Sequence, residues 1–95
     1  MTYRLSRKAE DDIVAIYVTG VREFGFDQAE RYHAALAQIF EFLAENPRGA
    51  RERTELDPPV RAHRYKAHLI IYRLDGSDIL ILRVRHGRED WLNRD

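Results

Sequence analysis

The fold of this chain is decided by one stretch near its C-terminal end, LIIYRLDGSDILILRVR at residues 69–85. Residues 69–74 and 79–85 are rich in β-branched and long apolar side chains, which are typical of strands. The turn sequence DGSD at 75–78 lies between them, and an Asp-Gly step is a strong hairpin signal. Residues 60–65 also have a strand-like pattern. The sequence therefore predicts three consecutive strands that form a meander.

Two helices are predicted before this meander. Apolar side chains recur at spacings of three and four over residues 7–24, and Ser6 is a suitable N-cap for that helix. A second apolar stripe follows from Asp27, with Glu30 three residues on as in a capping box. It ends at Asn46-Pro47, because the residue before a proline avoids helical geometry. Only two or three residues separate the helices, so they must form an antiparallel hairpin.

The remaining segments complete an α+β domain. Tyr3-Arg4-Leu5 predicts a short opening strand, and residues 48–59 predict a surface loop because they have no clean apolar period and end in two prolines. A chain of 95 residues suffices for one domain, which we expect to cover residues 1–95. The predicted order is β-α-α-β-β-β, with the helical hairpin packed on a mostly antiparallel sheet.

The composition is that of a folded protein, with 34% charged and 44% hydrophobic residues. The absence of cysteine excludes disulfides, thiolate metal sites and cysteine nucleophiles. No apolar run approaches the length of a membrane span, and the first residues have no apolar signal-peptide core. We therefore expect no membrane segment and a cytoplasmic location.

The charge is unevenly distributed along the chain. The formal net charge is zero, which by itself argues against a basic nucleic-acid-binding coat. However, residues 1–47 hold 5 basic and 8 acidic side chains, and residues 48–95 hold 11 basic and 8 acidic. Of the basic residues 14 are arginines, whose planar forks suit carboxylates and phosphates. The C-terminal half is therefore predicted to present a cationic face.

The last strand and its exit hold the richest set of candidate binding residues. Arg83 and Arg85 should share one face by strand alternation. One interpretation pairs these arginines with acidic residues of the helices and places the only tryptophan in the core. The other is a cationic patch for a phosphate backbone or an acidic partner. Its candidates are Arg61, Arg64, Arg83, Arg85, His86, Arg88 and Trp91.

The sequence offers little for catalysis. It contains no GxGxxG, P-loop, GxSxG or HExxH motif, and we predict neither a cofactor nor a metal site. Metal-free RNA cleavage would need a general base, a general acid and cationic stabilisation of the transition state. His86 could serve as acid or base, but the only candidate partners are Glu52 and Glu55 in the predicted loop.

A further prediction concerns an apolar surface. The runs at residues 69–72 and 79–82 are almost continuously apolar, which suggests that both faces of the sheet are covered. The helical hairpin can cover only one face. The other should bind a partner, such as an amphipathic helix or an added strand.

Several collinear segments carry a resemblance to a known family. They are YRLS at 3–6, the helix start from Ala9 to Ile13, QAxxY at 28–32, LAENPRG at 43–49, HLIIYR at 68–73 and ILRVRHGREDW at 81–91. Together with the predicted order of elements, they resemble the RelE/ParE superfamily of toxins from type II toxin–antitoxin systems, and within it the ParE branch. The resemblance covers nearly the whole chain.

The resemblance implies a function and partners. ParE-like members poison DNA gyrase without being enzymes and block replication, whereas RelE-like and YoeB-like members are ribosome-dependent mRNA endonucleases. The ribonucleases carry an arginine where this chain has His68 or Leu69, and RelE-like members use loop lysines that residues 48–59 lack. His86 does resemble the C-terminal histidine of the YoeB-like enzymes. Gyrase poisoning is therefore the favoured expectation, and mRNA cleavage is the alternative.

The resemblance also implies a ParD-like antitoxin that lays an acidic, amphipathic segment over the toxin. We expect a heterotetramer or larger assembly through an antitoxin dimer. The cationic candidates would bind the antitoxin or a gyrase–DNA target. The apolar surface under the antitoxin would consist of Leu69, Ile71, Ile79 and Ile81.

Overall fold

The computed structural model describes residues 2–54 and 59–87. Its helices and strands follow the predicted order, with one additional two-residue strand in the segment expected to be a loop. The elements are β1 (Tyr3–Leu5), α1 (Arg7–Phe24), α2 (Phe26–Glu45), β2 (Glu52–Arg53), β3 (Val60–Tyr65), β4 (His68–Asp75) and β5 (Asp78–His86).

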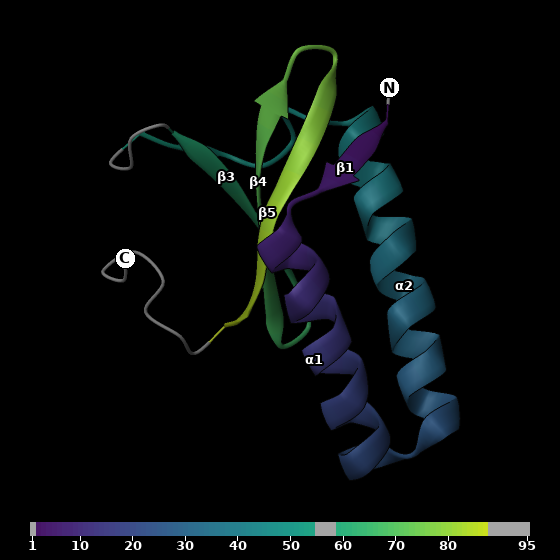
Figure 1. Cartoon of the computed structure of the whole chain (residues 1–95). Helices are drawn as coiled ribbons and strands as arrows, with labels where there is room; N and C mark the ends of the chain where they lie inside the picture. Colours follow the sequence, from purple (N-terminus) through teal and green to yellow (C-terminus); the bar gives the residue numbers. More distant parts are fainter. Residues whose placement is uncertain (1, 55–58, 88–95) are drawn as a thin grey trace.

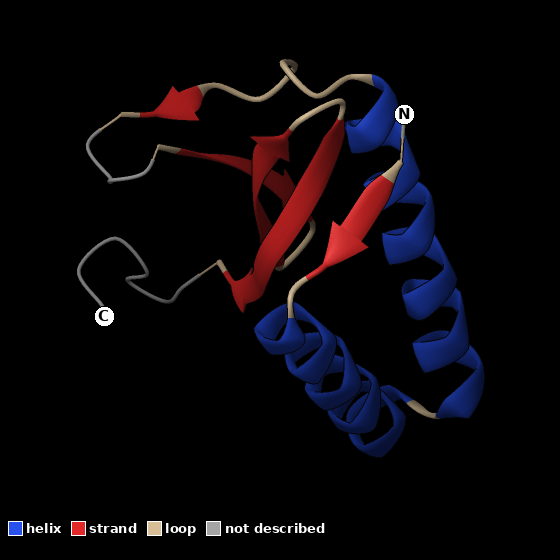
Figure 2. Cartoon of the chain, turned by 45° about the horizontal axis from the view of Figure 1, so that its top comes forward, coloured by secondary structure: helices blue, strands red, loops and turns tan. Residues whose placement is uncertain are grey.

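The strands form one sheet in the order β1-β5-β4-β3-β2 (Figure 2). The strands β2 to β5 pair antiparallel, while β1 pairs parallel to β5. This pairing confirms the predicted α+β fold with a mostly antiparallel sheet. The backbone N–H of Ser6 donates to the carbonyl of Ile81 over 2.9 Å, and the Ser6 hydroxyl accepts from the N–H of Ala9. Ser6 therefore joins β1 to the start of α1, as its predicted role of N-cap requires.

The hairpin connection is shorter than predicted, because Gly25 alone joins α1 to α2 (Figure 1). Gly25 has φ 93°, a backbone conformation that a residue without Cβ adopts at little cost. Its N–H donates to Val21 and its carbonyl accepts from Ala29. The predicted start at Asp27 was one residue late, and no side chain caps α2. Glu30 instead accepts a hydrogen bond from the Tyr17 hydroxyl of α1.

The core lies between the helical hairpin and one face of the sheet. Tyr72 of β4 is fully buried, and its hydroxyl donates to the carbonyl of Pro47 over 3.0 Å. Burial of each large apolar side chain contributes about 1.5–3 kcal/mol, so this layer fixes the hairpin on the sheet. The main core side chains are Leu36, Phe40, Leu43, Ile70, Tyr72, Ile79, Ile81 and Val84.

The strand register assigns the remaining side chains to a face. Residues directly opposite one another in antiparallel strands point to the same side. Tyr72 pairs with Arg61 and Ile81 and lies on the helix-covered face, whereas Leu69 pairs with Arg64 and Arg85 on the opposite face. We call this second side the outer face of the sheet. Within the described residues, no helix is long and apolar enough to cross a membrane.

Candidate functional site

The outer face brings together part of the predicted cationic patch. Arg64, Leu69 and Arg85 form one row across β3, β4 and β5. Leu69 is half-buried, and Arg64 is exposed. A Cβ built on Gly87 would lie 2.6 Å from Nη1 of Arg64. Glycine at that position therefore lets the guanidinium of Arg64 lie over the exit of β5.

The next row of the outer face is more deeply buried. Ile71 pairs with Ala62 and is only 5% exposed, so it contributes less open surface than predicted. Arg73 lies opposite Leu80 on the same face, and both are half-buried. The outer face thus combines half-buried leucines with arginines, a combination suited to an amphipathic, acidic ligand.

Arg83 is engaged within the chain. Its Nε and Nη2 donate to the two carboxylate oxygens of Asp12 on α1, over 2.8 and 2.9 Å. The same carboxylate accepts from the backbone N–H of Val84 over 2.9 Å. For this arginine the structure shows the pairing with a helix acid that was one of the two sequence interpretations. The pair ties α1 to the edge of β5.

Three predicted residues lie on the helix-covered face. Ile79 and Ile81 are fully buried, so the prediction that they belong to an open apolar surface was wrong. Strand alternation turns them toward the hairpin, where they form the core. Arg61 lies opposite Tyr72 and donates to the carbonyl of Ala50 over 2.6 Å, which separates it from Arg64 and Arg85. The predicted Arg88 and Trp91 lie outside the described residues.

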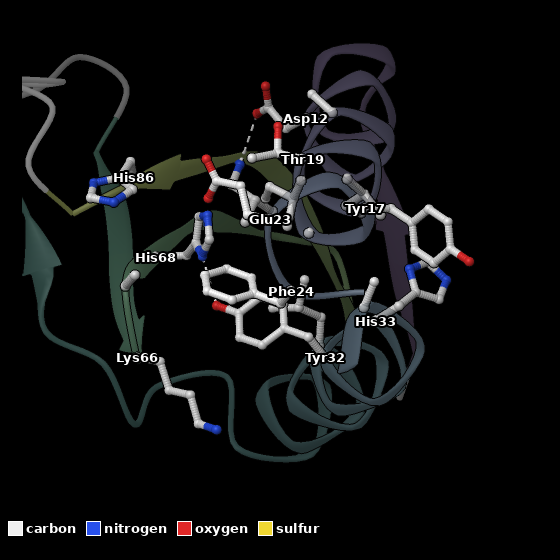
Figure 3. A pocket seen from close by; sticks show the side chains of 18 of the residues that line it. Asp12, Tyr17, Thr19, Glu23, Phe24, Tyr32, His33, Lys66, His68 and His86 are labelled. Atoms are coloured by element: carbon white, nitrogen blue, oxygen red, sulfur yellow. Dashed lines mark hydrogen bonds between the residues drawn. The ribbon is translucent and has the colours of Figure 1, made fainter. Parts of the chain in front are cut away.

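A cleft of about 710 Å³ lies between the free half of the helical hairpin and the end of the sheet (Figure 3). Its helix side includes Asp12, Thr19 and Glu23, and its sheet side includes His68 and His86. Apolar side chains of both helices line much of it. A volume of this size is within the range of ligand-binding clefts.

Three aromatic side chains meet at this cleft. The Tyr32 hydroxyl and Nδ1 of His68 are 2.6 Å apart, and the rings of His68 and His86 meet edge to face with centroids 5.7 Å apart. Burial raises the pKa of Tyr32 to about 12, with a smaller contribution from Tyr65. His86 is exposed and therefore accessible at the cleft mouth. The sequence analysis named His86 as a candidate binding residue but did not include His68 or Tyr32 among the candidates.

The residues around the cleft do not form a metal centre. No group of three or more His, Cys, Asp or Glu side chains in residues 2–54 and 59–87 could hold a metal ion. The chemistry at the site rests instead on imidazoles, a phenol and arginines.

Comparison with known proteins places this arrangement in a class. A solved chain described as "Chromosomal ParDE TA system from P. aeruginosa" has a TM-score of 0.74 at 28% identity, over 90% of this chain and 95% of its own. The fold is thus similar to that of a chain from a toxin–antitoxin system.

The sequence comparisons are more specific. The family described as ParE toxin of type II toxin–antitoxin system, parDE, matches residues 3–91. Toxin ParE1 of Caulobacter vibrioides is 32% identical over 88% of this chain and 86% of its own length. Toxin ParE of Escherichia coli is 31% identical over 97% of this chain and 90% of its own length. The chain belongs to the ParE toxin family, and this confirms the resemblance inferred from the sequence.

Proposed function

We propose that this chain is a non-enzymatic toxin that inhibits DNA gyrase and blocks replication, and that a ParD-like antitoxin neutralises it. The observation that carries the proposal is membership of the ParE family over residues 3–91. In cells the toxin would act in the cytoplasm, where gyrase and DNA are located.

The outer face supports the proposal of an acidic antitoxin segment. Arg64 and Arg85 flank the half-buried Leu69 in one row. An amphipathic segment could place apolar side chains on Leu69 and carboxylates on the arginines. Assembly through an antitoxin dimer would then give a heterotetramer or a larger complex. In the free toxin we expect Arg64 and Arg85 to contact the gyrase–DNA target, so that the antitoxin neutralises by covering them. Arg88, Trp91 and His86 stay candidates for either set of contacts.

A second candidate function has one observation in its favour. His86 has an imidazole partner, His68, whose orientation is fixed by Tyr32. Two imidazoles could in principle share the acid and base steps of metal-free RNA cleavage. Ribosome-dependent mRNA cleavage is therefore the alternative, and replacement of either histidine distinguishes it from gyrase poisoning.

A gyrase cleavage assay tests the favoured function directly. Purified toxin is incubated with gyrase, ATP and supercoiled plasmid, and the reaction is stopped with detergent and protease. We expect linear plasmid to accumulate, because a poison stabilises the cleaved complex. Addition of the cognate antitoxin should prevent the accumulation of linear plasmid. His86→Ala and His68→Ala should lower the yield of linear plasmid less than they would lower the yield of cleaved mRNA. Absence of linear DNA together with His86-dependent mRNA cuts would establish the alternative.

A further inference from the structure

Helix α1 carries a second apolar seam that the core does not use. The core stripe includes Ala9 and Ile13, whereas Val14, Val18 and Val21 recur on another face at spacings of four and three. Val14 is 63% exposed and Val18 is 48% exposed. Alternating spacings of four and three are the pattern of a helix seam that packs against another helix.

The seam continues in charged residues at both ends. Asp11 precedes Val14 by three residues, and Arg22 follows Val18 by four, so both lie on the same side of the helix. Both charged side chains are exposed. The seam thus carries the acidic side chain of Asp11 near its N-terminal end and the basic side chain of Arg22 near its C-terminal end.

The surfaces assigned so far leave this seam unused. The cleft is lined by other faces of α1, and the proposed antitoxin contacts lie on the outer face of the sheet. In Figure 1, the lower half of α1 extends past the end of β5, and Val14 and Val18 are largely exposed. A second helix therefore has access to it.

We propose that this seam, formed by Asp11, Val14, Val18, Val21 and Arg22, pairs antiparallel with the same seam of a second copy of the chain. The pairing is centred between Val14 and Val18, so that Val14 of each copy packs against Val18 of the other. A two-fold axis relates the copies, and each surface complements itself.

The charges select this orientation. In the antiparallel arrangement Asp11 of one copy lies beside Arg22 of the other, and the two-fold axis makes the ion pair twice. A parallel arrangement would place Asp11 against Asp11 and Arg22 against Arg22, which is unfavourable. Antiparallel alignment also brings opposite ends of the two helix dipoles together.

The size of the seam indicates how tightly two copies of the chain should bind each other. An 18-residue helix is about 27 Å long at 1.5 Å per residue, and only three valines form the apolar part. Such a contact falls below the roughly 1,000 Å² that stable interfaces exceed. The dimer should therefore be weak, with a dissociation constant in the micromolar to millimolar range, and should appear in the free toxin as its concentration rises.

Sedimentation velocity over a concentration series tests the pairing on the full chain freed from antitoxin. We expect a monomer–dimer equilibrium for the wild type and a monomer for Val18→Glu. Asp11→Arg should raise the dissociation constant by about tenfold, because like charges then oppose each other. The double reversal Asp11→Arg with Arg22→Asp should restore the wild-type constant to within about twofold, since the ion pairs re-form with opposite sense. Circular dichroism verifies that each variant is folded.

Glu41→Arg is the matched control, because Glu41 is exposed on α2 and outside the seam. It should leave the dissociation constant unchanged. A wild-type chain that stays monomeric at the highest concentration overturns the proposal, as does a dimer that survives Val18→Glu. Failure of the double reversal to restore pairing overturns the antiparallel geometry. If Val18→Glu instead abolishes antitoxin binding while the wild type is monomeric, the seam belongs to the antitoxin and the proposal is wrong.

Discussion

Asp12 on α1 and Arg83 on β5 form a two-bond ion pair, and the same carboxylate also accepts from the backbone of Val84. The side chains are 15% and 31% exposed, so solvent screens them only in part. One carboxylate thus joins the first helix to the last strand across most of the sequence. It also holds the Arg83 side chain against α1.

Replacement of Asp12 should destabilise the fold. Asp12→Ala removes the three hydrogen bonds that this carboxylate accepts from Arg83 and Val84, so we expect a loss of about 2–4 kcal/mol in the free energy of unfolding. Urea denaturation followed by circular dichroism measures it. The neighbouring exposed Asp11→Ala should lose less than about 0.5 kcal/mol. Equal losses in both variants would show that the pair does not hold α1 against β5.

The arginines of the outer face should matter for toxicity. Arg64→Ala and Arg85→Ala should each weaken growth inhibition more than Arg31→Ala on α2. An arginine that contacts a partner contributes about 1 kcal/mol or more, which is roughly a tenfold change in affinity. Colony counts after induction measure the effect, with soluble protein levels matched by immunoblot. Equal effects at all three positions would refute a functional outer face.

Arg83→Ala should also lower toxicity, but for a different reason. Loss of its contact with Asp12 should lower the thermal midpoint, whereas Arg64→Ala should leave it nearly unchanged. A thermal melt of each variant separates the two causes. If Arg83→Ala keeps the wild-type thermal midpoint but loses toxicity, Arg83 instead contacts a partner.

The hairpin turn gives a prediction about two glycines. Gly25→Ala forces a Cβ into φ 93° and should cost about 1–2 kcal/mol of unfolding free energy. Gly20→Ala is the matched control inside α1, where the new Cβ would lie 3.4 Å from that of Ala29. It should be neutral or slightly stabilising because alanine favours helices. Chemical denaturation compares the two, and a harmless Gly25→Ala would contradict the one-residue connection.

Tyr32 should make stability fall at alkaline pH. Its folded pKa of about 12 lies above the usual value near 10, so its neutral phenol stabilises the fold at pH below about 10. This contribution is lost as the pH rises through 12. Tyr32→Phe should therefore show a shallower loss of unfolding free energy above pH 10, measured by urea titration at several pH values. Burial also raises the pKa of Tyr72, so the Tyr32→Phe variant should still lose some stability above pH 10. An equal dependence of unfolding free energy on pH in the variant and the wild type would refute the role of Tyr32.

The sequence predicted the helices and strands well because local signals placed them. The period of α1, its Ser6 cap and the turn near Gly76 each act over a few residues. The pairing of β2 with β3 was not predictable, since two residues give no apolar period. The helix-facing positions Ile79 and Ile81 were misassigned because both faces of β5 are apolar, so the sequence alone did not say which side the helices cover.

The arrangement of the site depended on one bulge. Strands β4 and β5 pair regularly from the turn, where Asp75 opposes Asp78, as far as Tyr72 opposite Ile81. The register then shifts by one residue, so that Ile71 opposes Arg83. A one-residue shift moves the following side chains to the other face. The bulge therefore places Val84 in the core, puts Arg85 beside Leu69 on the outer face, and brings His86 opposite His68. A hairpin extended regularly from its turn would have paired His68 with Arg85.

The most direct test of gyrase poisoning is the order in which DNA and protein synthesis stop after induction without antitoxin. Cells are pulse-labelled with thymidine and with an amino acid at intervals after induction. We expect thymidine incorporation to fall first, with filamentous cells and an SOS response while translation continues. Early arrest of protein synthesis, with DNA synthesis continuing, would contradict the proposed target.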